Sequence, residues 1–567
     1  DFSLAGYLTA IPGFLLIASA WTDSSILRRI RQVYFGLIAF VMACIFIVDL
    51  GLYGFWGFRL DATPIFYFFS SPKDAIASVS FWFVLLGILA MLVYAAVLYS
   101  IFYIVLIRER KPLKIPYRRQ NVSLALLLLT AALFIPIRGG FTVSTMNLSK
   151  VYYSQDQRMN HAAINPAFSF MYSATHQNNF EKQYRFMDPQ KADELFAEMV
   201  DKPAVTADSI SQLLNTQRPN IIFIILESFS THLMETFGGH PNVAVNMDKF
   251  AKEGILFSNF YASSFRTDRG LASIISGYPG QPSTSIMKYP EKTDKLPSIP
   301  RSLRNAGYSL EYYYGGDADF TNMRSYLMSS GFENIISDQD FPVSERLSKW
   351  GAHDHLVFNR LLEDMKAEAA DTASAENARP FFQVLQTSSS HEPFEVPYRR
   401  LANDRLNAFA YTDSCVGDFV KRFRELPQWK NTVLVLVPDH LGAYPEHLNN
   451  LSVDRYQIPL LLIGGAVSEP RRIDIYGSQH DIAATLLAQL SLPHQDFVFS
   501  KDMLNPASPH FAFFAVPDAF GMVTPDNQLI FNCEANAVAV DEGSTKGKNL
   551  LPGKAYLQKL YDDIAKR

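Results

Sequence analysis

The stretch PNIIFIILESFS, residues 219–230, decides the fold of the larger part of this chain. Its apolar residues run without interruption from Ile221 to Leu226, whereas a half-exposed strand would alternate apolar and polar side chains. Uninterrupted β-branched and aromatic residues are typical of a strand buried on both faces, as in a parallel sheet. The run ends in a carboxylate, Glu227.

Similar runs follow along the chain, and helical patterns alternate with them. Further strands are predicted at 255–260, 309–314, 381–386, 433–437 and 459–463. Helices are predicted at 247–253, 271–276, 299–306, 321–330, 401–425 and 480–490. This alternation predicts an α/β domain with a doubly wound, mostly parallel sheet. A small antiparallel β region at 511–540 and a terminal helix at 554–566 are expected to follow it.

Residues 1–138 are strongly apolar and aromatic, unlike the rest of the chain. Four apolar runs stand out, at 4–20, 33–55, 80–107 and 122–137. Because a helix needs about 20 apolar residues to cross a bilayer, these runs predict a transmembrane domain of four helices. Asp49, inside the second run, is either a functional carboxylate within the membrane or an interfacial one.

Basic residues cluster in two of the loops between these runs. The loop at 56–79 has only Arg59 and Lys73, offset by Asp61 and Asp74, while the other two loops carry Arg28, Arg29 and Arg31, and Arg108, Arg110, Lys111, Lys114, Arg118 and Arg119. By the positive-inside rule the two basic loops are cytoplasmic, so everything after residue 137 is extracytoplasmic. Residue 1 would then lie outside as well, and we expect one further helix before it in a multi-pass protein of the cytoplasmic membrane.

The polar segment 139–217 is expected to be a packed helical linker, because Asp188 and Pro189 suit the N-cap and first position of a helix. The extracytoplasmic catalytic domain then covers residues 218–567. A net charge of -4 without a basic stripe outside the membrane loops argues against a nucleic-acid partner. The three cysteines form no zinc motif, and a disulfide between Cys415 and Cys533 is one option in an oxidising compartment.

Ionisable side chains follow three of the expected strands. Glu227 ends the first strand, Asp439 and His440 follow the strand at 433–437, and His391 follows the strand at 381–386. Ligands of open α/β sheets bind at the carboxyl ends of the strands, so these groups should meet at one edge. Two carboxylates and an imidazole suit Mn²⁺, Mg²⁺ or Zn²⁺. Taken alone, a glutamate at a strand end is more often simply solvated.

Thr267 lies in SSFRTDRGLASIISG, residues 263–277, at the expected start of a helix. A helix N-terminus offers free N–H groups and the positive end of the dipole, and both suit a phosphate. The hydroxyl could serve only as an N-cap. A metal ion bound beside it would also lower its pKa and make it a nucleophile.

Eight motifs stand in a characteristic order and spacing. They are IILESFS (224–230), MDKFAKEGILFSNFYAS (247–263), FRTDRG (265–270), YYGGDADFTNMRSYL (313–327), WGAHDHLVF (350–358), SSSHEPF (388–394), VPDHLGAYPE (437–446) and SQHDIAATLL (478–487). In these motifs the chain resembles the lipoteichoic acid synthase-like phosphoglycerol transferases of the alkaline phosphatase/sulfatase superfamily. The resemblance covers nearly the whole chain and implies membrane helices, a helical linker and an extracytoplasmic α/β domain.

The resemblance implies a role for each matched residue. Glu227, Thr267, Asp439 and His440 match the metal ligands of the family, and Thr267 also matches its nucleophile. His391 matches a catalytic histidine that contacts the substrate phosphate or the leaving group.

The match is looser around residues 321–324. The synthases carry an aromatic–Asn–Arg triplet that grips the phosphoglycerol, but here Thr321, Asn322 and Met323 stand at that place and Arg324 follows one position later. Asn322 and Arg324 are the expected substrate contacts. Trp350 and Asp354 are expected to wall the pocket, with core packing as the alternative for Trp350. His480 and Asp481 are not expected to be ligands.

One absence is informative. Sulfatases use a formylglycine made from the first residue of a C/S-x-P-x-R motif, and the corresponding segment here reads Thr-Asp-Arg-Gly. The resemblance therefore implies that Thr267 attacks phosphorus directly, with one divalent metal ion, Mn²⁺ before Mg²⁺ or Zn²⁺. A phosphoglycerol-type headgroup would leave a phosphatidylglycerol-like membrane phospholipid, form a phosphothreonine and pass to an envelope glycan, polymer or lipid. The alternatives are a phosphoethanolamine donor, a phosphodiester hydrolase, and a catalytically silent lipid-sensing envelope protein.

Overall fold

The computed structural model describes residues 1–22, 24–56, 59–60, 81–108, 118–154, 156–175, 179–203, 211–372, 379–442, 444–446 and 448–567. The chain divides into two compact units, Asp1–Asn178 and Asn179–Arg567. The division falls inside the predicted linker, so the first part of that segment belongs to unit 1 and the second part to unit 2.

Unit 1 contains the apolar helices. They are α1 (Phe2–Ser19), α2 (Ser25–Trp56), α5 (Phe81–Phe102) with a π turn (Tyr103–Ile107), α6 (Arg119–Ala132) and α7 (Phe134–Arg138). Four stretches are long and apolar enough to cross a membrane: Phe2–Ser19, Ser25–Gly54, Phe81–Ile107 and Arg119–Arg138. The side chains of α5 are not buried by the protein, so their apolar surface requires a lipid environment. Asp61, Lys73, Asp74, Arg110, Lys111 and Lys114, used above to orient the chain, lie outside the described residues.

The Asp49 carboxylate is buried within unit 1 and binds two nearby groups. Its carboxylate pairs with the Arg59 guanidinium at 2.5 Å and accepts a hydrogen bond from the Leu60 N–H at 2.8 Å. The Arg59 Nε–H donates to the carbonyl of His161, in the short helix α8 (Gln157–Ala163), at 2.6 Å. The helix α9 (Pro166–Thr175) completes the unit. The Asp49 carboxylate therefore helps to fasten α8 to the end of α2.

The linker helix α10 (Pro189–Ala197), in unit 2, has the predicted start. The Asp188 side chain accepts a hydrogen bond from the Gln190 N–H, and Pro189 takes the first helical position.

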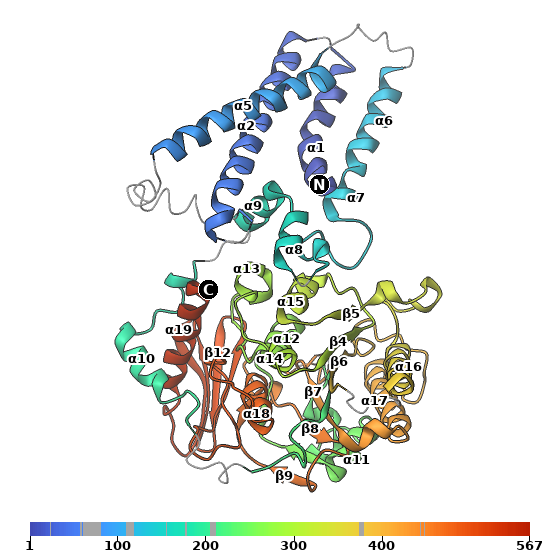
Figure 1. The fold of residues 1–567 in the computed structure, drawn as a ribbon, viewed down its shortest axis with the longest axis vertical. Coiled ribbons are helices and arrows are strands. Elements are labelled where there is room, and N and C mark those ends of the chain that lie inside the picture. Colours follow the sequence, from blue (N-terminus) through green and yellow to red (C-terminus); the bar gives the residue numbers. More distant parts are fainter. Residues whose placement is uncertain are drawn as a thin grey trace. The chain divides into compact units, whose positions relative to one another are not determined.

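The central sheet of unit 2 has the strand order β5-β4-β6-β1-β7-β8-β2-β9. Figure 1 labels β5, β4, β6, β7, β8 and β9 among these strands. Its strands are β1 (Asn220–Leu226), β2 (Ile255–Phe257), β4 (Ser309–Tyr314), β5 (Asn334–Ile336), β6 (Phe381–Gln386), β7 (Thr432–Pro438), β8 (Leu460–Ile463) and β9 (Arg471–Ile473). β1 lies between β6 and β7 and is parallel to both, as its uninterrupted apolar run predicts. Only β8 runs antiparallel to its neighbours among the described strands of this sheet. The predicted mostly parallel sheet is confirmed.

The single strand predicted at 255–260 is wrong. The structure has β2 and a separate β3 (Phe260–Tyr261), which pairs with β10 (Gly477–Ser478) in a second sheet. The break lies at Ser258, whose N–H donates to the Ile473 carbonyl and whose hydroxyl bonds to Asp474. After these bonds to the end of β9 the chain leaves the central sheet and enters the second one.

Alternate residues of β1 enter two different cores. Ile221, Phe223 and Ile225 belong to a core covered by α12 (Thr267–Ser276), α14 (Ile299–Asn305), α15 (Met323–Ser330) and α18 (Ile482–Gln489). Ile222, Ile224 and Leu226 belong to a core covered by α11 (Val245–Glu253), α16 (Asp354–Thr372) and α17 (Asp404–Phe423). Helices therefore cover both faces of the sheet, and both faces of β1 are apolar for that reason.

The disulfide that the sequence leaves open is not formed. Cys415 and Cys533 are both free, because Cys415, a residue of α17, lies in one core while Cys533 packs against the other core.

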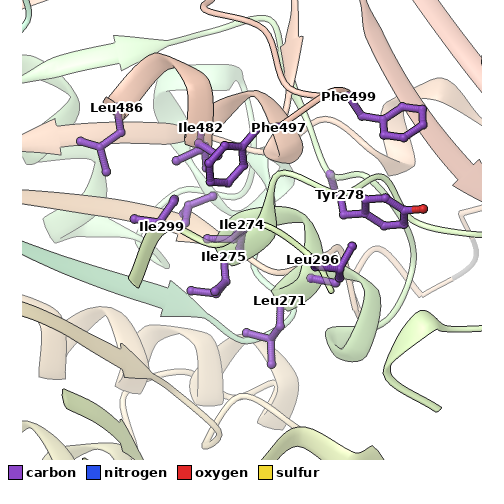
Figure 2. Close-up of a cluster of buried hydrophobic side chains, with 14 of the residues drawn as sticks. Leu271, Ile274, Ile275, Tyr278, Leu296, Ile299, Ile482, Leu486, Phe497 and Phe499 are labelled. Atoms are coloured by element: carbon purple, nitrogen blue, oxygen red, sulfur yellow. The ribbon is translucent and has the colours of Figure 1, made fainter. Parts of the chain in front are cut away.

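The helix α12 is fixed by its apolar side. Figure 2 shows Leu271, Ile274 and Ile275 packed among side chains from α14, α18 and the segment after it. Full burial of one such side chain contributes about 1.5–3 kcal/mol, so this packing holds the start of α12 firmly in place. The short α13 (Pro290–Thr293) precedes α14.

The C-terminal part forms the predicted small antiparallel sheet. Its strands are β11 (Ala512–Val516), β12 (Ala519–Thr524), β13 (Asn527–Asn532) and β14 (Ala537–Gly543), followed by α19 (Leu550–Lys566).

Candidate active site

Glu227 and Asp439 lie side by side because β1 and β7 are parallel neighbours. The last residues of the two strands, Leu226 and Pro438, are in register, so the next residue of each chain emerges at the same edge. One ligand atom from each of Glu227, Asp439 and His440 lies within 4.8 Å of the other two. Among the residues that the structure describes, this is the one group of three such side chains that could hold a metal ion.

The two oxygens of the Asp439 carboxylate differ in their hydrogen bonding. Its Oδ1 accepts hydrogen bonds from the backbone N–H groups of Ser228 and His440, both at 2.8 Å. Its Oδ2 is buried and has no hydrogen-bond partner among the described residues. Burial and the charge of Glu227 raise the pKa of Asp439. A buried carboxylate oxygen without a donor is costly, and a cation at this place would satisfy it.

The pKa values of Glu227 and His440 are shifted in the directions that keep both groups charged. Burial alone would raise the pKa of Glu227, but His440, His391 and the Ser228 hydroxyl outweigh it and hold that pKa below its ordinary value. The Ser228 hydroxyl donates to Glu227 Oε1 at 2.6 Å. Burial lowers the pKa of His440, whereas Asp439 and Glu227 raise it more strongly, so the balance is upward. The donor set of two carboxylates and one imidazole fits a divalent metal ion.

Thr267 faces this group from the first turn of α12. Its hydroxyl lies 3.3 Å from Glu227 Oε2 and 3.3 Å from His440 Nε2. The N-cap is Arg266, so Thr267 is the first helical residue and not the cap. The absence of a side chain at Gly270 permits this approach, since a Cβ there would lie 2.4 Å from the Asp439 carbonyl oxygen. The predicted nucleophile and the three other predicted ligands are thus brought together.

His391 stands beside an aromatic wall. The imidazole and the Trp350 indole have ring centroids 4.1 Å apart, and Trp350 packs edge-on against Phe320 at 5.8 Å. The indole N–H donates to the Glu392 carbonyl at 2.7 Å, which fixes the ring. His391 and Trp350 are each partly exposed. Trp350 is therefore not a core residue, and its side chain is open to a ligand.

Asn322 and Arg324 are engaged by the protein itself. Asn322 is buried, has a φ of 62° and donates through Nδ2 to the Met287 carbonyl at 3.1 Å. Arg324 donates through Nε to Asp319 at 2.7 Å. This ion pair braces the loop that carries Phe320, and substrate contact by Arg324 stays a prediction.

Three further residues lie away from the group of ligands. Asp354 is fully buried, and its carboxylate binds the backbone of Ser388 and Ser389. His480 is buried between the Ser263 hydroxyl at 2.9 Å and the Tyr556 hydroxyl at 3.2 Å. Asp481 pairs with Lys501 at 2.6 Å, in a buried ion pair. Neither His480 nor Asp481 belongs to the candidate metal group among the described residues.

The sequence analysis did not single out Tyr314. This residue ends β4, and burial together with the carboxylates of Glu227, Asp317 and Asp439 raises the pKa of its phenol. Two of these carboxylates, Glu227 and Asp439, belong to the candidate metal group. The same strand-end criterion that pointed to Glu227 would have found Tyr314.

Comparisons with known proteins bear on the family and the fold of this chain. Residues 219–492 match the family model described as Sulfatase. Phosphoglycerol transferase I of Xanthomonas axonopodis pv. citri is 27% identical over 321 residues, covering 52% of this chain and 44% of the relative. Lipoteichoic acid synthase-like YvgJ of Bacillus subtilis is 21% identical over 315 residues, covering 50% of each chain. This chain thus spans about half the length of these curated relatives.

A solved structure shares the fold of unit 2. The protein in the alkaline phosphatase superfamily from Vibrio parahaemolyticus superimposes with a TM-score of 0.57 at 24% identity, covering 68% of this chain and 98% of the other. The family-model match and these relatives support the expected likeness to the lipoteichoic acid synthase-like proteins of the alkaline phosphatase/sulfatase superfamily, and the shared fold agrees with it.

Proposed function

We propose that this protein is a metal-dependent transferase that moves a phosphoglycerol-type headgroup from a membrane phospholipid to an envelope acceptor. The observation that carries the proposal is the position of the Thr267 hydroxyl, 3.3 Å from both Glu227 and His440. These two residues form a group with Asp439, one of whose buried oxygens has no hydrogen-bond partner among the described residues. The relatives named phosphoglycerol transferase I and lipoteichoic acid synthase-like YvgJ support the same chemistry.

Glu227, Asp439, His440 and Thr267 would hold the divalent ion, for which we propose Mn²⁺ before Mg²⁺ or Zn²⁺. When bound, such an ion supplies positive charge that lowers the pKa of a coordinated hydroxyl and offsets charge on the phosphoryl oxygens. The ligand set is intact in this chain, which argues against a catalytically silent protein.

Thr267 is the proposed nucleophile. Its oxygen forms a bond to phosphorus as the bond from phosphorus to the diacylglycerol oxygen breaks, and the Thr267 proton passes to the Glu227 carboxylate. His391 gives a proton to the leaving alkoxide and becomes neutral. The headgroup then stays on Thr267 as a phosphodiester. In the second half of the reaction His391 takes the proton of an acceptor hydroxyl, whose oxygen forms the new bond to phosphorus as the bond from phosphorus to the Thr267 oxygen breaks. Glu227 returns the proton to Thr267.

The aromatic wall is the proposed contact surface for the headgroup. Trp350 and Phe320 offer partly exposed rings, and the Trp350 ring lies next to His391. Asn322 and Arg324, which follow Phe320 in the chain, are the further proposed contacts. The four candidate membrane spans would keep the domain at its lipid donor. In this proposal the protein lies in the cytoplasmic membrane with unit 2 outside, and the acceptor is an envelope glycan, polymer or lipid.

The Arg324–Asp319 ion pair favours a second candidate for the phospholipid that donates the headgroup. A free arginine would favour a headgroup whose hydroxyl groups can accept its hydrogen bonds, whereas here Asp319 takes up the Nε–H. A phosphoethanolamine headgroup, which carries its own cation, is therefore the second candidate. A hydrolase in which water is the acceptor uses the same first step.

The test uses the full chain with Mn²⁺ and vesicles that contain either phosphatidylglycerol or phosphatidylethanolamine. We expect diacylglycerol release from phosphatidylglycerol by the wild-type protein and none by Thr267→Ala of unchanged thermal stability. Release only from phosphatidylethanolamine would select the second donor. Diacylglycerol release by Thr267→Ala at the wild-type rate would overturn the proposed mechanism.

A further inference from the structure

The segment 387–391, which follows β6, forms two hydrogen bonds with the backbone of Glu227. The Glu227 N–H donates to the Thr387 hydroxyl at 2.9 Å, and the Ser390 hydroxyl donates to the Glu227 carbonyl at 2.7 Å. His391, at the end of the segment, donates through its N–H to the Ser388 carbonyl at 3.2 Å. The position of one predicted metal ligand and of the predicted acid therefore depends on a single short loop.

Asp354 holds the middle of this loop. Its Oδ1 accepts hydrogen bonds from the N–H groups of Ser388 at 2.8 Å and Ser389 at 3.1 Å, and its own N–H donates to the Ser389 hydroxyl at 2.9 Å. Its Oδ2 accepts from the Thr412 hydroxyl of α17 at 2.7 Å. The side chain is fully buried, so a substrate has no access to the carboxylate.

We propose that Asp354 is a positioning residue, which sets the metal affinity of the site through the 387–391 loop and does not contact the substrate. The inference rests on the proposed function because it takes Glu227 to be a metal ligand. Groups that orient metal ligands from outside typically change metal affinity by about 10–100-fold when they are removed. Asp354 would act in this way over two steps, from its carboxylate to the loop backbone and from the loop to Glu227.

The chain offers a matched control one residue after Thr412. Asp413 is 1% exposed, and its carboxylate accepts hydrogen bonds from the N–H groups of Asn246 and Met247, both at 2.9 Å. It therefore resembles Asp354 in burial and in hydrogen bonding. It fastens the start of α11, however, and not the loop at the metal group.

The experiment measures Mn²⁺ affinity by titration calorimetry and thermal unfolding on the full chain in detergent. We expect Asp354→Ala to weaken Mn²⁺ binding by about 10–100-fold. Asp413→Ala should lose comparable thermal stability but keep its Mn²⁺ affinity within about twofold, because its partners do not reach Glu227. Asp354→Asn should recover most of the affinity, since its amide oxygen can still accept both N–H groups. Thr412→Val should fall between the wild type and Asp354→Ala.

Wild-type affinity in Asp354→Ala would overturn the inference, and so would an equal loss in Asp413→Ala. If Asp354→Ala does not fold, Thr412→Val decides, and it must bind Mn²⁺ more weakly than Asp413→Ala. The lipid KM of Asp354→Asn should stay at the wild-type value, since a positioning residue makes no substrate contact. Failure of the wild-type protein to bind Mn²⁺ would remove the proposed function and this inference together. Tight wild-type binding with an unaffected Asp354→Ala would remove only this inference.

Discussion

Replacing Gly270 by alanine tests whether the close approach of α12 to Asp439 sets the geometry of the site. A Cβ at this position would lie 2.4 Å from the Asp439 carbonyl oxygen and 3.0 Å from its carbonyl carbon. Ordinary contact begins at 3.4 Å, so α12 must move by about 3.4 − 2.4 = 1.0 Å. Thr267 lies on the same helix, three residues earlier, and would move with it.

Two opposing terms decide the sign of the stability change. In a helix interior, alanine is more favourable than glycine by about 1 kcal/mol. Overpacking a well-filled core costs about 1–3 kcal/mol. Since the obstacle is backbone and not a flexible side chain, we expect overpacking to win and the free energy of unfolding to fall by up to about 2 kcal/mol. A shift of about 1 Å at a reacting group can lower the rate about 100-fold, so the larger effect should be on kcat.

The assay compares urea unfolding and lipid turnover in Gly270→Ala and in Gly254→Ala. A Cβ at Gly254 would lie 2.3 Å from the Leu462 carbonyl oxygen, a similar clash with strand backbone. Because β8 runs antiparallel to β7, its last residues, Leu462 and Ile463, lie at the opposite end of the strands from Asp439. We expect both variants to lose stability and only Gly270→Ala to lose kcat. A Gly270→Ala protein that is more stable than wild type and fully active would refute the reasoning.

Three further predictions concern charge, pH and the aromatic wall. In EDTA, Asp439→Asn should unfold at or above the wild-type temperature, because it removes a charge that burial and Glu227 disfavour. Adding Mn²⁺ should raise its unfolding temperature less than that of the wild type, and thermal scans with and without the metal check both results. Burial lowers the pKa of His480 from 6.5 to about 4, so as the pH falls the unfolded chain binds a proton before the folded protein does. The free energy of unfolding should therefore fall by up to about 3 kcal/mol between pH 6.5 and about pH 4. Urea unfolding across this range should show a flatter profile in His480→Gln, and an unchanged slope would contradict the assignment. Trp350→Ala should lower kcat/KM for the lipid by about tenfold, the upper end of what one aromatic contact contributes; a wild-type value would show that the wall does not touch the substrate.

The parts of the fold set by buried strands could be predicted from the sequence. The strands at 309–314 and 381–386 have the predicted bounds, and β1 was predicted from its uninterrupted apolar run. The four apolar helices follow from the length of their runs. These features are local, since each is encoded in consecutive residues.

Features that depend on distant partners could not be predicted in the same way. The break between β2 and β3 depends on Ile473 and Asp474, more than 200 residues along the chain. The helix Asp354–Thr372 was not among the predicted elements, although Val357, Leu361 and Met365 recur at helical spacing and gave a local signal.

The same distinction holds for the site. Glu227, Asp439 and His440 were found because they follow apolar strands directly, and parallel strands bring their ends together. Asp354 was expected at the pocket wall, but its partners Ser388, Ser389 and Thr412 come from other segments, and its buried position follows only from the folded structure. The engagement of Arg324 by Asp319 likewise concerns side-chain direction, which spacing along the sequence does not give.

The central claim is that Thr267 carries the headgroup as a covalent intermediate. Its most direct test is mass spectrometry of the peptide that contains Thr267, after the full chain has reacted with phosphatidylglycerol and Mn²⁺ and has been quenched in acid. We predict the added mass of phosphoglycerol on Thr267 in the wild-type protein and none without lipid. Turnover of the lipid by Thr267→Ala, with no adduct on the wild-type peptide, would contradict the account.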